Sequence, residues 1–156
     1  MEVSFSRQFI STSVKKTQDI GKILGQNLQN GSIIALFGEL GTGKTTLTRG
    51  IAKGLGIKNI DFVISPSFVL IREYEGKIPL YHIDLYRLKK TSDILSLGIE
   101  EYFYGDGVCV IEWAEKIKTL LPDEKIDIKM FYENLDKRKI KINIFGKKYK
   151  PLLLYL

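Results

Sequence analysis

The chain has 156 residues, of which 44% are hydrophobic, and a formal net charge of +6. This size and composition predict a single domain, residues 1–156, with its own core. We expect no secretory signal peptide, because no basic segment followed by an apolar one opens the chain, and no membrane span, because no apolar run approaches about 20 residues. One cysteine, Cys109, and one histidine cannot form a disulfide framework or a zinc-type cluster, so we expect a cytoplasmic protein.

In chain order, the first half of the sequence predicts strands alternating with helices. Ile20, Leu24 and Leu28 recur every four positions, a spacing typical of a helix with one buried face, and Leu47 and Ile51 begin a second such series. Short apolar runs bounded by turn residues predict the strands. The expected elements are a strand at 3–10, a helix at 14–28, a strand at 32–37, a helix at 44–55 and a short strand at 62–64.

Residues 38–45, which join the strand at 32–37 to the start of the helix at 44–55, read G-E-L-G-T-G-K-T and match the phosphate-binding loop (P-loop) pattern G-x-x-x-x-G-K-[ST]. Its glycines let backbone N–H groups turn around phosphate oxygens, and the following helix adds its positive N-terminus. Lys44 supplies a charge for the outer phosphates and a catalytic role, while Thr45 offers a hydroxyl to Mg²⁺. The predicted nucleotide-binding residues are Gly38, Glu39, Leu40, Gly41, Thr42, Gly43, Lys44, Thr45 and Thr46. No N-K-x-D element for guanine follows, so ATP is the expected nucleotide.

The second half of the sequence predicts more strands. Ile126, Ile128 and Met130 alternate with polar residues, which is typical of a strand with one buried face. The expected elements are a strand pair at 68–74 and 80–86, a helix at 91–102, a buried strand at 108–113, a short helix at 114–121, and a hairpin of strands at 126–130 and 140–144. We therefore predict an α/β fold: a P-loop NTPase-like central sheet flanked by helices, mixed with antiparallel strands towards the C-terminus.

Two acidic residues stand where apolar strands end. Glu112 follows the apolar run 108–111, and Asp84 ends the run 81–83. Ligands of α/β sheets gather at such strand ends, and a carboxylate so deep is costly without a cation or metal beside it. A phosphate loop also needs a carboxylate to hold Mg²⁺ or its water shell, and we predict that Glu112 and Asp84 are the candidates for this role.

Neighbouring polar and aromatic residues have less specific interpretations. His82, between two apolar residues, is expected to make a structural hydrogen bond. Trp113 is expected to anchor the core, although its place beside Glu112 leaves base stacking open. The loop 65–68 could reach a phosphate or be a plain turn, and Arg87 is either an internal charge clamp or part of a salt bridge.

The positive charge is concentrated near the C-terminus. The segment after Asp136 has no acidic residue and takes seven of the 24 bases, which leaves 17 bases against 18 acids before it. A solvated strand face explains this, and so does a docking surface for RNA or an acidic partner. The seven bases are Lys137, Arg138, Lys139, Lys141, Lys147, Lys148 and Lys150.

Taken together, these motifs resemble the TsaE (YjeE) family. The resemblance runs from about residue 14 to 113, and more weakly to the strand of Arg138, through G-E-L-G-T-G-K-T-T, S-P-S-F, H-I-D-L-Y-R-L, L-G-I-E-E-Y-F and I-E-W. It implies an ATPase required to make threonylcarbamoyladenosine on tRNA. The implied partners are the proteins TsaB and TsaD, a transferase complex that ATP turnover would reset between cycles and through which tRNA would be reached.

The resemblance also implies roles for single residues. Lys44 and Thr45 would bind phosphate and Mg²⁺, Glu112 would serve Mg²⁺, and Asp84 would be needed for hydrolysis. The segment 14–17, including Val14, and Arg138 would lie near the base or sugar. Two departures stand out: Ser67 replaces the usual threonine of S-P-T, and Thr42 stands where alanine is usual, on what we expect to be the outer side of the loop.

Two other functions remain open on the residues alone. A P-loop small-molecule kinase combines the same loop, a strand-end acid and arginines at this size. However, an arginine-rich lid is expected of a kinase, and residues 89–107 contain no arginine. An RNA-binding module would use the basic C-terminal segment.

Overall fold

A mixed seven-stranded sheet forms the centre of the computed structural model, which describes residues 1–66 and 68–156. The strand order is β1-β7-β6-β2-β5-β4-β3. Neighbours from β6 to β4 run parallel, whereas β1–β7, β7–β6 and β4–β3 are antiparallel pairs. The predicted α/β fold is confirmed. The strands are β1 (Phe5–Ser11), β2 (Ile33–Phe37), β3 (Ile71–Tyr74), β4 (Leu80–Asp84), β5 (Val108–Glu112), β6 (Lys125–Asn134) and β7 (Lys137–Phe145).

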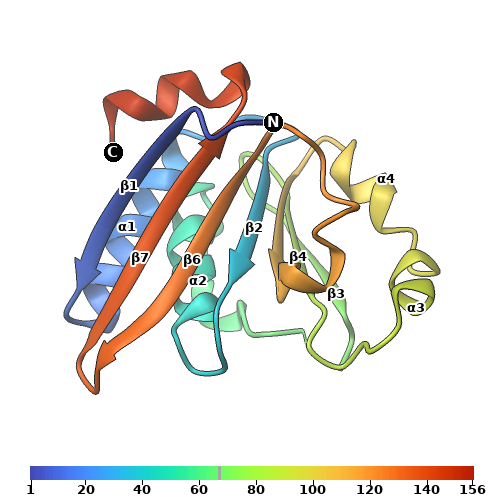
Figure 1. Cartoon of the computed structure of the whole chain (residues 1–156), viewed down its shortest axis with the longest axis horizontal. Helices are drawn as coiled ribbons and strands as arrows, with labels where there is room; N and C mark the ends of the chain where they lie inside the picture. Colours follow the sequence, from blue (N-terminus) through green and yellow to red (C-terminus); the bar gives the residue numbers. More distant parts are fainter. Residues whose placement is uncertain (67) are drawn as a thin grey trace.

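Helices lie on both faces of this sheet (Figure 1). Alternation along β2 divides its side chains between two cores: Ile34 and Leu36 pack with the helices of one face, and Ile33 and Ala35 with those of the other. The first face carries α1 (Val14–Gln26) and α2 (Lys44–Gly54). The second carries α3 (Thr91–Leu95), α4 (Ile99–Phe103) and the 3₁₀ turn η2 (Ala114–Ile117). Two further 3₁₀ segments are η1 (Ile60–Phe62) and η3 (Lys147–Leu154).

Three of the predicted elements were wrong. Residues 62–64 do not form a strand: η1 ends at Phe62, whose side chain is 70% exposed. The helix expected at 91–102 is two short helices, because Gly98 adopts a left-handed conformation (φ 67°) between them. The helix expected at 114–121 is only the 3₁₀ turn η2. The strand pair is also shorter than expected, since β3 begins at Ile71.

The parallel strands bring the predicted site residues to one edge. β2, β5 and β4 are neighbours with parallel directions, so the P-loop after β2 lies beside the ends of the other two. In the register, Glu112 pairs with Leu36 on one side and with Asp84 on the other. None of the described helices is long and apolar enough to cross a membrane.

Candidate functional site

The P-loop ends at Gly43, which caps α2 in the left-handed region (φ 103°) that glycine adopts without strain. Lys44, the first residue of α2, is only 5% exposed. Its ammonium donates hydrogen bonds to the carbonyls of Gly38 (2.5 Å) and Glu39 (2.8 Å) and lies 4.3 Å from the centre of the Trp113 ring. Burial lowers the pKa of Lys44 below its usual value, against the attraction of nearby carboxylates such as Glu112.

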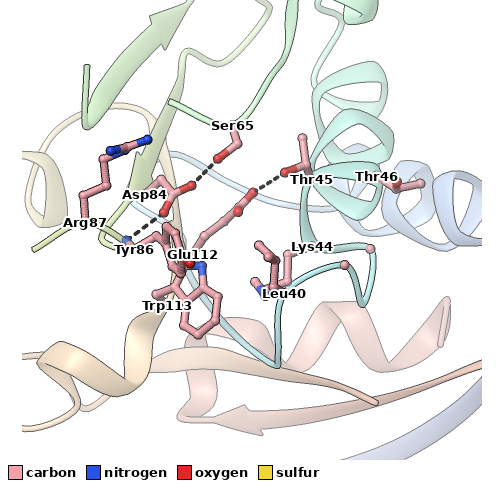
Figure 2. A pocket seen from close by; sticks show the side chains of 12 residues that line it. Leu40, Lys44, Thr45, Thr46, Ser65, Asp84, Tyr86, Arg87, Glu112 and Trp113 are labelled. Atoms are coloured by element: carbon pink, nitrogen blue, oxygen red, sulfur yellow. Dashed lines mark hydrogen bonds between the residues drawn. The ribbon is translucent and has the colours of Figure 1, made fainter. Parts of the chain in front are cut away.

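Glu112 is held by hydrogen bonds from two other elements. The Thr45 hydroxyl donates to its Oε1 at 3.0 Å (Figure 2), and His82 Nε2 lies 2.9 Å from the same oxygen. Because an ionised carboxylate only accepts, the imidazole carries its proton on Nε2. His82 is completely buried, so its ring fixes the direction of the Glu112 side chain. This is the structural hydrogen bond expected of His82.

Asp84 has a separate set of donors. Its carboxylate accepts hydrogen bonds from the Ser65 hydroxyl and from the backbone N–H of Tyr86, the latter at 2.9 Å (Figure 2). Both acids are buried. Asp84 is therefore fixed in place beside Glu112 without sharing a hydrogen-bond donor with it.

A cavity of about 440 Å³ opens in front of these groups. It brings together Lys44, Thr45, Asp84 and Glu112, contributed by α2, β4 and β5. Trp113 also lines it, which places this ring at the site as well as against the core. The remaining lining residues are Leu40, Gly41, Gly43, Thr46, Ser65, Tyr86 and Arg87.

A second cavity of about 340 Å³ lies on the other side of the loop and contains Val14 and Arg138. The two cavities share Gly41, Gly43 and Thr46, so they flank the same turn. The Arg138 guanidinium lies 4.3 Å from the centre of the Tyr132 ring. This arrangement offers one compartment for phosphates and an adjoining one, with an arginine, for the nucleoside.

The expectation that Thr42 faces the outer side of the loop was wrong. Thr42 is 1% exposed, and its hydroxyl donates a hydrogen bond to the Glu39 carbonyl at 2.9 Å, which closes the loop on itself. Ser67, the other departure from the family pattern, lies outside the described residues.

The structure adds supporting residues that the sequence did not indicate. The Lys116 ammonium donates to the carbonyls of Leu85, Tyr86 and Leu88 at 2.5–2.8 Å, and so fastens the segment after Asp84 to η2. The Tyr132 hydroxyl donates to the Leu40 carbonyl at 3.1 Å. These partners are about 30 or more positions away in sequence, and no local spacing reveals them.

The basic C-terminal segment does not form one surface. Arg138 lines the second cavity, and Lys137, Lys139 and Lys141 lie on β7. The other lysines of the segment, Lys147, Lys148 and Lys150, lie in η3, at the end of the sheet opposite the P-loop (Figure 1). The seven bases therefore lie on separate parts of the molecule, and a docking role for the segment stays a prediction.

Comparison with known proteins identifies the family of this chain. The family profile "Threonylcarbamoyl adenosine biosynthesis protein TsaE" matches residues 11–140. A protein named tRNA threonylcarbamoyladenosine biosynthesis protein TsaE from Bacillus subtilis is 42% identical over 139 residues, 88% of this chain and 85% of the relative. Its namesake from Nostoc is 43% identical over 137 residues, covering 85% and 82%. The crystal structure of Bacillus subtilis YdiB superposes with a TM-score of 0.83 at 35% identity, covering 99% of this chain and 95% of the other. The chain belongs to the TsaE family.

Proposed function

We propose that this chain is a magnesium-dependent ATPase that serves the threonylcarbamoyladenosine modification of tRNA in the cytoplasm. The observation that carries the proposal is the contact between Thr45 Oγ1 and Glu112 Oε1, 3.0 Å, beside the buried Lys44 and Asp84. A P-loop hydroxyl and a strand-end carboxylate in contact form the usual protein half of a magnesium–nucleotide site.

The donor atoms fit Mg²⁺, which prefers oxygen ligands and keeps several waters. Thr45 and Glu112 would hold it, and His82 would keep the Glu112 carboxylate aimed at it. When bound, the ion would neutralise charge on the phosphate oxygens. The cavity has two buried carboxylates, Asp84 and Glu112, and the buried ammonium of Lys44 balances the charge of only one of them. A bound cation would balance the other.

The chain's own groups divide the remaining work. Lys44 neutralises the β- and γ-phosphate oxygens. Asp84, held by Ser65 and the Tyr86 N–H, accepts a hydrogen bond from the attacking water and aligns it. The Trp113 ring, whose centre lies 4.3 Å from the Lys44 ammonium, limits access of bulk water. Val14 and Arg138 receive the nucleoside in the second cavity.

The role in tRNA modification is supported by the names of the relatives, which describe biosynthesis of threonylcarbamoyladenosine on tRNA. We propose that the chain acts with a TsaB–TsaD-type complex and meets tRNA through it. Pull-down from extract in ATP, ADP or no nucleotide tests the partnership: capture of such a complex that differs between nucleotides is the expected result.

Replacing Lys44 by alanine tests the ATPase itself. Lys44→Ala should weaken ATP binding strongly and abolish release of inorganic phosphate from γ-labelled ATP. Lys53→Ala, an exposed position in the last turn of the same helix, is the matched control and should behave as the native chain. Label that passes to a metabolite instead of water would establish a kinase, and unchanged ATP affinity in Lys44→Ala would refute the assignment of the loop.

A further inference from the structure

The sheet face opposite α1 and α2 carries a row of lysines. Because Ile126, Ile128, Ile140 and Ile142 pack in the core with those helices, the residues that alternate with them point the other way. Figure 1 shows this face towards the viewer, with α1 and α2 behind β1, β7 and β6. We call it the open face; it consists of Ser6, Gln8, Ile10, Lys125, Asp127, Lys129, Phe131, Lys139, Lys141, Asn143 and Phe145.

The strand register lines up its positive charges. Lys129 of β6 pairs with Lys141 of β7, which pairs with Gln8 of β1. In the next row, Phe131 pairs with Lys139. Two acids lie beside the four lysines of the open face: Asp127, which is buried among them, and Glu133, whose carboxylate lies 3.4 Å from the Lys139 ammonium. The face is thus positively charged.

Aromatic rings are interleaved with these lysines. Phe131 is 43% exposed, and the Lys139 ammonium lies 5.3 Å from its ring centre. The Lys125 ammonium lies 4.6 Å from the centre of the Phe145 ring. An exposed ring beside lysines offers a stacking partner for a base and charges for its phosphates.

A cleft of about 360 Å³ continues the open face to the P-loop. It shares Lys129 and Phe131 with that face and adds further aromatic rings. Its other walls are Phe37, Gly38, Glu39, Thr42, Met130 and Tyr132. An acidic protein partner would bind the lysines but gain little from a cleft lined by aromatic rings. An unpaired RNA segment would use both, because its phosphates would bind the lysines and a base would stack on a ring.

We propose that the open face and this cleft bind an unpaired segment of RNA, with a base against Phe131 and phosphates on Lys129 and Lys141. The inference goes beyond the proposed ATPase function and does not depend on it, because Lys129, Lys141 and Phe131 line neither the phosphate cavity nor the nucleoside cavity. It also places the RNA site on β1, β6 and β7 and not on the whole of the basic C-terminal segment.

Binding of a labelled tRNA transcript, without nucleotide, between about 50 and 200 mM salt tests the proposal by fluorescence anisotropy. Lys129→Ser/Lys141→Ser should weaken binding about tenfold or more and reduce the slope of log K against log salt by about 1.4, since each lost phosphate contact to a single strand contributes about 0.7. Lys147→Ser/Lys150→Ser removes the same charge from exposed positions of η3 and should change affinity less than about twofold.

A second variant tests the stacking. Phe131→Ser should weaken binding of an unpaired RNA loop about fivefold or more, and binding of a continuous RNA duplex much less. Equal losses in the two lysine variants, or equal losses on loop and duplex, would overturn the proposal. Polyglutamate bound as tightly as tRNA, with the same dependence on Lys129 and Lys141, would assign the face to an acidic protein. Thermal unfolding checks that each variant is folded, and phosphate release should be native in all of them.

Discussion

Asp84 and Glu112 are neighbours in the sheet register, yet their contacts differ. Glu112 accepts a hydrogen bond from the Thr45 hydroxyl, the group that a P-loop normally directs to Mg²⁺. Asp84 accepts hydrogen bonds from Ser65 and a backbone N–H, and it lines the cavity. Two buried acids with different donors are suited to two different roles, one towards the cation and one towards the attacking water.

Single amide substitutions should separate these roles. Glu112→Gln should raise the Mg²⁺ concentration needed for ATP binding by about tenfold or more, because an amide is a poor partner for a hard cation. Asp84→Asn should leave ATP binding mostly intact and slow single-turnover hydrolysis by about a hundredfold or more. Glu100→Gln, an exposed position of α4, is the control. Normal hydrolysis by Asp84→Asn, or loss of binding alone in both variants, contradicts the division.

Among single residues, the sequence predicted those that a local pattern marks. The P-loop and the strand-end acids could be predicted because a motif and an apolar run mark them. The hydrogen-bond partner of His82 and the contacts of Lys116 could not be predicted, because they depend on which strand or loop lies alongside. The sequence therefore indicates the groups that line the cavity better than those that hold them in place.

Among the elements, α1 and α2 make the closest contact. Gly21 and Gly25 of α1 face Gly50 and Gly54 of α2, and a methyl group on Gly50 would lie against the carbonyl oxygen of Gln18. The two backbones can approach this closely only without side chains between them. The contact fixes α2, and with it Lys44 and Thr45, relative to the rest of the fold.

Gly50→Ala should therefore destabilise the protein. Alanine in place of glycine usually stabilises a helix by about 0.5–1 kcal/mol, but here overpacking against the α1 backbone should cost about 1–3 kcal/mol. Urea unfolding measures the difference. Lys53→Ala on the exposed side of α2 should stay within about 0.5 kcal/mol of the native chain. A gain in stability for Gly50→Ala would show that the helices can separate at little cost.

α1, α2 and the β6–β7 hairpin have periodic patterns and lie where expected. β2, a short apolar run, also lies where expected, directly before the P-loop motif. Residues 62–64 failed because a short apolar run does not reveal whether a partner strand exists. The helix at 91–102 failed because its spacing continues across Gly98, whereas the backbone does not.

On β6, Asp127 gives a prediction with a definite pH dependence. Burial raises the pKa of its carboxyl, against Lys125, Lys129 and Lys118, and Oδ1 has no hydrogen-bond partner within residues 1–66 and 68–156. A raised pKa in the folded state means that the ionised form costs stability at pH 7 and that this cost disappears as pH falls through the raised pKa. Asp127→Asn should raise the unfolding temperature at pH 7, with a gain that shrinks towards pH 4. Asp123→Asn, exposed in the preceding loop, should show no such gain.

Over the whole molecule, the two cavities join parts of the chain that are distant in sequence. The first is lined by α2 and the ends of β4 and β5, and the second by β1, α1 and the β6–β7 turn. A nucleotide that fills both would contact elements on either side of β2. Binding should then oppose unfolding of the whole sheet and not only of the loop.

Magnesium and ATP together should consequently raise the unfolding temperature of the whole protein. At a hundred times Kd the gain is about 2.7 kcal/mol, which corresponds to about 5–10 °C for a chain of this size. Lys44→Ala should lose the shift, and Glu112→Gln should lose the part that requires Mg²⁺. GTP at the same concentration should give a smaller shift, because the sequence has no guanine-recognition element. Differential scanning calorimetry measures the shift in unfolding temperature in each of these four cases. Equal shifts with GTP would contradict the preference for ATP, and a shift that survives in Lys44→Ala would place the nucleotide elsewhere on the molecule.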